Sequence, residues 1–120
     1  MVLVDTSVWI SYLRAGNSKF EQLLNDGEAA CHPFIIGELA CGNIKNRAEI
    51  LSLLNALPKV NLLDNEEVLL FIERNNLMGK GLGLIDIHLL ASALLSEAVL
   101  WTLDIKLKHE AHILGVAYEY

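Results

Sequence analysis

The sequence predicts an α/β domain in which a parallel β-sheet is covered by helices on both faces. Three observations support this fold class. Short apolar segments alternate along the chain with helical patterns of apolar residues. The strand-like segments are apolar throughout instead of at every second position, which is typical of strands buried on both faces. The chain has 120 residues and shows no repeat, linker or low-complexity segment, so we expect one domain over residues 1–120.

The expected strands are short and, where the pattern is clear, rich in β-branched residues. They are residues 2–4, 29–32, 60–62, 99–102 and 115–118.

Between the expected strands, apolar side chains recur at helical spacing. The expected helices lie around residues 8–13, 20–24, 35–40, 50–57, 68–72 and 84–95. The third ends near Gly42 and the fourth before Pro58, two residue types that commonly stop helices. The segment 84–95 is apolar on nearly all sides and is therefore expected at the centre of the domain.

Composition argues against a membrane protein and leaves the substrate open. Hydrophobic residues make up 53% of the chain, but no apolar run reaches the roughly 20 residues needed to cross a bilayer. The amino terminus has no basic flank and meets an acid at Asp5, which argues against a signal peptide and favours a cytoplasmic protein. The net charge of −6 is unusual for a protein that binds nucleic acid.

Four of the fifteen acidic residues lie in apolar surroundings: Asp5, Glu38, Asp86 and Asp104. An ionised carboxylate is costly there unless a cation or hydrogen-bond donors meet it. Asp5 and Asp104 follow expected strands, so they belong to the sheet edge where α/β proteins bind ligands. A structural alternative stays open, because the three aspartates could cap helices and Glu38 could pair with an Arg or Lys.

The chemistry of such a cluster points to a metal ion. Neighbouring carboxylates repel one another and raise their pKa values unless a divalent cation joins them. Oxygen ligands suit Mg²⁺ or Mn²⁺ better than zinc, and such an ion activates water for attack on a phosphate. Setting the four acids aside leaves nine basic against eleven acidic side chains, so net charge does not exclude a nucleic-acid substrate.

Around these acids the sequence resembles the PIN-domain family, and within it the VapC-type toxins of prokaryotic toxin–antitoxin pairs. The four acidic motifs are matched in order by residues 4–10, 36–39, 83–86 with 91–93, and 100–104, and residues 107–116 resemble the usual tail. The resemblance spans essentially the whole chain. Four ordered motifs are also far more specific than any one of them alone.

The resemblance implies a three-layer α/β/α fold with a central parallel sheet and an endoribonuclease that depends on Mg²⁺ or Mn²⁺. It implies that Asp5, Glu38, Asp86 and Asp104 bind or orient the metal ion and carry catalysis. It also implies an RNA substrate, a homodimer and inhibition by a cognate antitoxin. We expect a basic side chain of the antitoxin to enter the acidic site, and helices near residues 20–24 and 50–57 to form its groove.

The hydroxyl groups of Thr6 and Thr102 are weaker site candidates, because a capping or strand-end role explains them equally well. Leu107 stands where many relatives carry a further acid, which makes a second metal ion less expected than the first.

Lys80 could contact an RNA phosphate, although scattered basic residues usually serve solubility. Its glycine-rich loop, residues 78–83, lacks the spacing of a nucleotide-phosphate loop.

Two other functions are alternatives to the nuclease. An aspartyl-phosphate phosphatase also has an Asp after its first strand, but it needs a second Asp where this chain has Ser7. A non-catalytic PIN-like domain that binds RNA or protein is the alternative, and the presence of all four acids counts against it.

Overall fold

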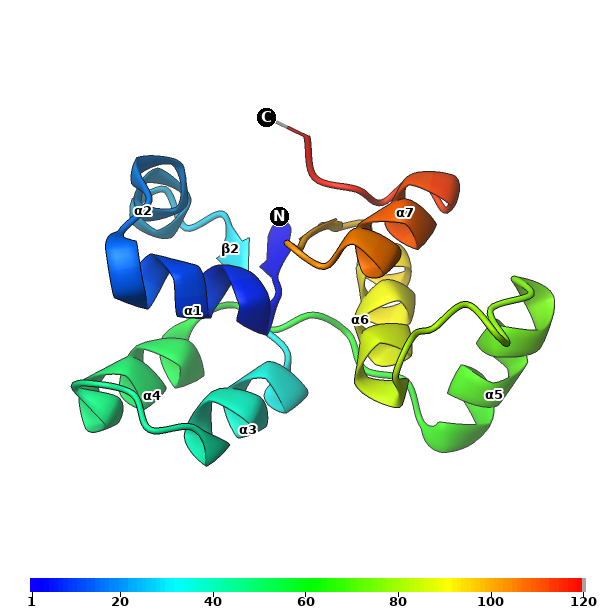
Figure 1. Ribbon diagram of the computed structural model, residues 1–120, viewed down its shortest axis with the longest axis horizontal. Coiled ribbons are helices and arrows are strands. Elements are labelled where there is room, and N and C mark those ends of the chain that lie inside the picture. Colours follow the sequence, from blue (N-terminus) through cyan, green and yellow to red (C-terminus); the bar gives the residue numbers. More distant parts are fainter. Residues whose placement is uncertain (120) are drawn as a thin grey trace.

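A parallel sheet of three strands forms the middle of the molecule (Figure 1). In the computed structural model, which describes residues 1–119, the strand order is β2–β1–β3. The strands are β1 (Val2–Val4), β2 (Ala29–Ala30) and β3 (Val99–Trp101). Val2 pairs with Ala29 on one side and with Val99 on the other, and Val4 pairs with Trp101. The expected parallel sheet is therefore confirmed.

The strands expected at residues 60–62 and 115–118 are reduced to single bridges. Lys59 lies beside Cys31 at one edge of the sheet, and Ala117 lies beside Leu100 at the other. At the first edge the chain turns away after one residue pair, because the N–H of Asn61 donates to the hydroxyl of Ser96 instead of to a strand. A strand needs several consecutive pairs, and these edges provide one each.

Helices cover both faces of the sheet, which gives the expected three layers. Helices α1 to α4 lie on one side, and α5 to α7 lie on the other (Figure 1). Their bounds are α1 (Thr6–Ala15), α2 (Ser18–Asn25), α3 (Pro33–Cys41), α4 (Arg47–Ala56), α5 (Asn65–Arg74), α6 (Leu84–Leu95) and α7 (Ile105–Ile113). All six helices expected between the strands are present.

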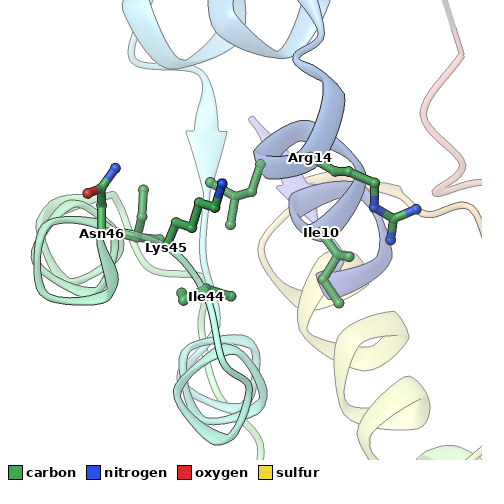
Figure 2. A pocket seen from close by; sticks show the side chains of 7 residues that line it. Ile10, Arg14, Ile44, Lys45 and Asn46 are labelled. Carbon is green, nitrogen blue, oxygen red and sulfur yellow. The ribbon is translucent and has the colours of Figure 1, made fainter.

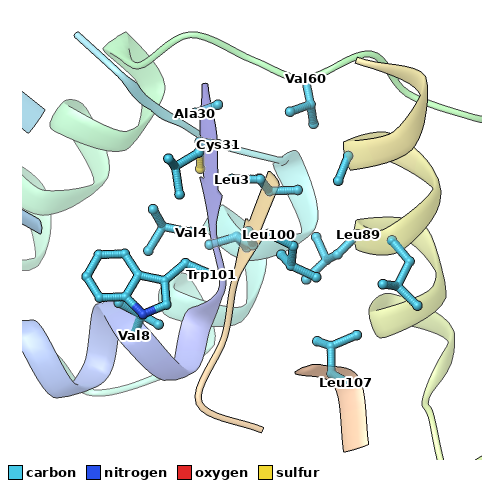
Figure 3. Packing of buried hydrophobic residues seen from close by; sticks show 14 of the residues in the cluster. Leu3, Val4, Val8, Ala30, Cys31, Val60, Leu89, Leu100, Trp101 and Leu107 are labelled. Carbon is cyan, nitrogen blue, oxygen red and sulfur yellow. The ribbon is translucent and has the colours of Figure 1, made fainter. Parts of the chain in front are cut away.

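The core lies between the central strands and the helices on either side (Figure 3). Leu3 and Val4 of β1 are fully buried, and so are Leu89 and Leu90 of α6. The whole stretch from Ile87 to Ala93 is buried, which confirms the central position expected for this helix. Burying one such leucine contributes roughly 1.5–3 kcal/mol, so α6 anchors the fold.

The second helix packs into the same core. Phe20 of α2 is fully buried, and its ring lies 4.6 Å from that of Trp9, centroid to centroid. Phe20 itself therefore offers no surface to a partner, and the docking groove expected at the helix near residues 20–24 stays a prediction. Among residues 1–119, none of the helices has the length and apolar character that crossing a membrane requires.

Candidate active site

The sheet register brings the ends of β1 and β3 together at one edge. The N–H of Asp5 donates to the carbonyl oxygen of Trp101 at 2.9 Å, which places Asp5 beside Thr102. The side chain of Asp5 is buried, and its Oδ2 accepts hydrogen bonds of 2.7 Å from the hydroxyls of both Thr102 and Ser7. This carboxylate is thus held in a fixed orientation at the end of the central strand.

The two hydroxyl groups that hold Asp5 also hold the β3–α7 turn. The Ser7 hydroxyl accepts from the N–H of Leu103 at 3.0 Å, and the Thr102 hydroxyl accepts from the N–H of Asp104 at 3.1 Å. Sequence reasoning missed Ser7. Its position two residues after Asp5 was a usable signal, since serine side chains at helix starts commonly bond to nearby polar groups.

Asp104 and Asp86 belong to the first turns of two helices. Asp104 is the N-cap of α7, and its Oδ1 accepts from the N–H of Leu107 at 3.1 Å. Asp86 lies in the first turn of α6, and its Oδ2 accepts from the N–H of Gly83 at 3.1 Å. Capping is therefore confirmed for these two aspartates. Asp5 occupies the N-cap position of α1 but makes no capping hydrogen bond with its side chain, so capping does not explain it.

Glu38 reaches the site from α3. Its side chain is exposed, and its Oε1 accepts a 2.7 Å hydrogen bond from the hydroxyl of Thr6 at the start of α1. Over residues 1–119 no Lys or Arg pairs with Glu38, so the proposed salt bridge is wrong. Thr6 and Thr102 each hold one acidic side chain of the cluster.

The pKa of Asp86 responds to the charges of the other three carboxylates. Burial raises the pKa of Asp86 above its ordinary value, and the hydrogen bond from Gly83 opposes that rise. The negative charges of Asp5, Asp104 and Glu38 raise the pKa further. Because charge–charge effects fade with distance, the fold brings these three acids, from segments far apart in the sequence, toward Asp86.

In each of the four carboxylates, one oxygen accepts a hydrogen bond (the committed oxygen), and the other accepts none from residues 1–119 (the open oxygen). The committed atoms are Oδ2 of Asp5, Oε1 of Glu38, Oδ2 of Asp86 and Oδ1 of Asp104. The second oxygen of each accepts no hydrogen bond from residues 1–119. As the side chains stand in this part of the chain, no three His, Cys, Asp or Glu residues lie close enough to hold a metal ion. The donor set nevertheless fits a hard divalent cation in kind, and such a cation would relieve the repulsion at Asp86.

A buried histidine lies at the start of α3. His32 is the N-cap of this helix, and its Nδ1 accepts from the N–H of Phe34 at 3.0 Å. Burial, followed by the nearby charge of His88, lowers the pKa of His32 to about 4. Because His32 is only 2% exposed and occupied with capping, its role is to start the helix that carries Glu38.

A separate hollow lies away from the four acids, between α1 and the connection from α3 to α4 (Figure 2). Its volume is about 430 Å³, and Lys45 extends from the connection toward α1. The lining combines an apolar floor with basic and polar side chains: Ile10, Leu13, Arg14, Ile44, Lys45, Asn46 and Ile50. None of the four acids lines it.

Comparison with known proteins agrees with the sequence motifs. The family model described as "PIN domain" matches residues 2–112. The chain is 48% identical over 118 residues to Ribonuclease VapC32 of Mycobacterium tuberculosis, in both the CDC 1551 and H37Rv strains, which covers 98% of this chain and 95% of that protein. The structure is also similar to the crystal structure of PAE2754 from Pyrobaculum aerophilum, with a TM-score of 0.61 and 20% identity over 91% of this chain and 78% of the other. At that identity, the last comparison supports the fold alone.

Proposed function

The chain belongs to the PIN-domain family, and we propose that it is a VapC-type toxin, a metal-dependent endoribonuclease with its active site at the four carboxylates. The name Ribonuclease VapC32, carried by a relative that matches nearly the full length, supports both the RNA substrate and the toxin role. The observation that carries the proposal is the acidic cluster, in which four carboxylates repel one another and each keeps one open oxygen.

Asp5, Glu38, Asp86 and Asp104 would hold the ion, and their oxygen atoms suit Mg²⁺ or Mn²⁺. When bound, such an ion supplies a more acidic water and stabilises negative charge on the attacked phosphate.

The chain's own residues orient this set of ligands. Thr102 and Ser7 fix Oδ2 of Asp5, and Thr6 fixes Oε1 of Glu38. Because the pKa of Asp86 is raised by burial and by its acidic neighbours, Asp86 takes up a proton sooner than an ordinary Asp as the pH falls.

The direct test of the proposed activity is RNA cleavage by the purified chain. We expect cleavage with Mg²⁺ or Mn²⁺, no cleavage in EDTA, and a loss of at least about 100-fold in Asp5→Asn. Asp26→Asn is the matched control, because Asp26 is an exposed residue at the end of α2. Cleavage that persists in EDTA, or in Asp5→Asn at the rate of Asp26→Asn, would falsify the metal mechanism.

The family implies an antitoxin, and we assign its docking site to the hollow between α1 and the α3–α4 connection. Ile10 and Ile50 offer apolar contacts there, while Arg14 and Lys45 add positive charge (Figure 2). This pattern suits an antitoxin segment with apolar side chains on one side and an acidic side chain at its edge. Ile50 belongs to the helix region expected from sequence, whereas buried Phe20 does not take part. Entry of a basic antitoxin side chain into the acidic cluster stays a prediction.

A substitution in the hollow between α1 and the α3–α4 connection should affect antitoxin binding and not catalysis. Lys45→Glu should weaken antitoxin binding by at least about 10-fold and leave RNA cleavage unchanged, because like charges oppose the acidic segment. Lys19→Glu, an exposed site on α2 outside the hollow, is the control. Equal antitoxin affinity in the two variants would place the partner elsewhere.

We also propose that the protein is a homodimer and acts in the cytoplasm, where a toxin that cleaves RNA meets its substrate. Exposed leucines on α5 and α6, among them Leu69, Leu70, Leu94 and Leu95, supply apolar surface for self-association. Analytical ultracentrifugation at micromolar concentration tests the dimer, and a single species with the mass of one chain would contradict it.

A further inference from the structure

A second hollow lies beside α7. Its volume is about 450 Å³, and its lining comes from the connection between α5 and α6 and from α7. It is lined by Gly79, Lys80, Ile105, Lys106, His109 and Glu110. The connection also carries Gly83, whose N–H binds Asp86, and α7 begins at the cap Asp104. The hollow is therefore built from the same two segments that position two of the four acids.

Lys106 has a defined place in this hollow. Its side chain lies against Gly81, so a Cβ atom added to that glycine would stand 2.9 Å from Nζ and 3.0 Å from Cδ of Lys106. Gly81 also has a φ of +77°, a conformation that favours glycine. The glycine thus leaves room for the lysine stem to lie across the connection, with its ammonium group beside the backbone.

The two lysines of the hollow carry charge that no acid neutralises. Over residues 1–119, neither Lys80 nor Lys106 has a carboxylate within 4.0 Å. The one acid in the lining, Glu110, lies 3.9 Å from Nε2 of His109 and is mostly buried. The hollow therefore presents two unpaired lysines on the α5–α6 connection and on α7, the two segments that adjoin Asp86 and Asp104 in the sequence.

Two of the other basic side chains are hydrogen-bonded to the backbone. Nζ of Lys59 donates to three backbone carbonyls around the end of α4, and Arg47 donates to the carbonyl of Ala40. Arg14 and Lys45 line the separate hollow between α1 and the α3–α4 connection. Lys80 and Lys106 are thus available to guide a polyanion to an active site that, by its own charge, repels it.

We propose that the hollow of Lys80 and Lys106 binds a phosphate group of the RNA strand next to the phosphate that is cleaved. This inference rests on the proposed ribonuclease function and adds a substrate-binding subsite to it. Contacts to phosphates position a strand without reading its sequence, so this subsite sets the register of the RNA over the acids. Ile105 is 85% exposed at the rim and offers an apolar surface to a neighbouring ribose or base.

The test compares Lys80→Gln/Lys106→Gln with Lys108→Gln. Lys108 lies on the same helix, but it lines a different hollow with His112, Tyr118 and Glu119. For cleavage of a single-stranded RNA, the double variant should raise KM by about 10-fold and leave kcat within about 2-fold, because phosphate contacts act mainly in binding. The dependence of log KM on log salt concentration should weaken by about 0.7 for each lysine removed. Lys108→Gln should match the wild type, and Lys106→Arg, which keeps the charge, should restore most of the loss from Lys106→Gln.

A second readout does not depend on catalysis. Fluorescence anisotropy of the same RNA in EDTA should show weaker binding and a shallower salt dependence for the double variant alone. Unchanged KM, affinity and salt dependence in a wild-type background that cleaves RNA would overturn the subsite and leave the ribonuclease function standing. An effect confined to binding of a protein partner would also overturn it. A wild-type chain that neither binds nor cleaves RNA would overturn both proposals.

Discussion

The sheet core is buried and apolar, whereas the carboxyl edge of the same sheet is acidic and only partly buried. In the core, Leu3 and Leu89 contact apolar neighbours (Figure 3). At the edge, Asp5 is 7% exposed, and Asp86 is desolvated beside other negative charges. The core stabilises the fold, whereas the edge holds an arrangement that is electrostatically unfavourable by itself. Strain of this kind at a functional site is commonly balanced by stability elsewhere in the domain.

The largest expected effect concerns Asp86 at the carboxyl edge, where one substitution should lower activity without lowering stability. Asp86→Asn should lower kcat for RNA cleavage by about 1,000-fold, because it removes a charge that acts on the metal ion and the phosphate. It should also leave the free energy of unfolding unchanged or raise it at pH 7, because the raised pKa of Asp86 means that the folded protein disfavours its charged form. Denaturant unfolding and cleavage rates on the same sample measure both effects.

Asp64→Asn is a suitable contrast for Asp86→Asn. Asp64 caps α5 by accepting from the N–H of Glu67 at 2.8 Å, and asparagine caps nearly as well. This variant should retain activity. A loss of stability in Asp86→Asn larger than in Asp64→Asn would contradict the view that the cluster is repulsive.

The next prediction concerns the core, where a substitution should lower stability and leave activity nearly unchanged. Leu89→Ala should reduce the free energy of unfolding by about 3 kcal/mol, since it leaves a cavity beside the central strands. Cleavage by the fraction that remains folded should stay within about 2-fold of the wild type. Exposed Leu84→Ala, on the same helix, should change stability by less than about 1 kcal/mol. A strong loss of kcat in folded Leu89→Ala would show that the two regions are not separate.

The buried histidine gives a smaller effect with a defined pH window. Because the pKa of His32 is about 4 in the folded protein and its ordinary value is 6.5, the unfolded chain binds a proton first as the pH falls. The stability that comes from keeping His32 neutral is present above pH 6.5 and is lost between pH 6.5 and 4. The loss should be about 2 kcal/mol, below the full value of the shift because solvent and relaxation screen it.

The control for the pH effect is His32→Asn, in which the amide oxygen can still cap α3 but does not titrate. Unfolding curves at several pH values should show a steeper loss of stability in the wild type than in this variant. Parallel curves would rule out His32 as the titrating group.

The smallest effect concerns the hydrogen bonds that orient Asp5. Thr102→Val removes the hydroxyl that donates to Oδ2 of Asp5 and accepts from the N–H of Asp104, while keeping the size and shape of the side chain. Cleavage should fall by about 10-fold, as expected when a group that orients a ligand is lost. Thr102→Ser keeps the hydroxyl and should stay close to the wild type. Equal losses in both variants would point to packing instead of hydrogen bonding.

Much of the fold could be predicted from the sequence because the local patterns and the tertiary structure agree. Six of the seven helices in residues 1–119 follow from apolar spacing, and α6 is central because it is apolar all round. The edge strands are shorter in the structure than the sequence pattern predicts. Residues 60–62 have a strand-like composition, but the N–H of Asn61 donates to the hydroxyl of Ser96. A competing hydrogen bond from a residue 35 positions away cannot be read from a local pattern.

The four acids could be singled out from the sequence as site candidates, but the side chains that bind them could not. Asp5, Glu38, Asp86 and Asp104 stood out because acids are rare within apolar segments. The role of Ser7 depends on the register of Val4 against Trp101, which brings the β3–α7 turn over the start of α1. The place of Lys106 likewise depends on Gly81, a contact between segments 25 residues apart.

The central claim is that these carboxylates act as one binding site for a divalent ion, and titration of Mn²⁺ by isothermal calorimetry tests it most directly. The wild-type protein and Asp26→Asn should bind Mn²⁺ with the same affinity, and Asp5→Asn should bind it at least about 10-fold more weakly. Equal affinity in all three proteins, or no binding to the folded wild type, would contradict the account.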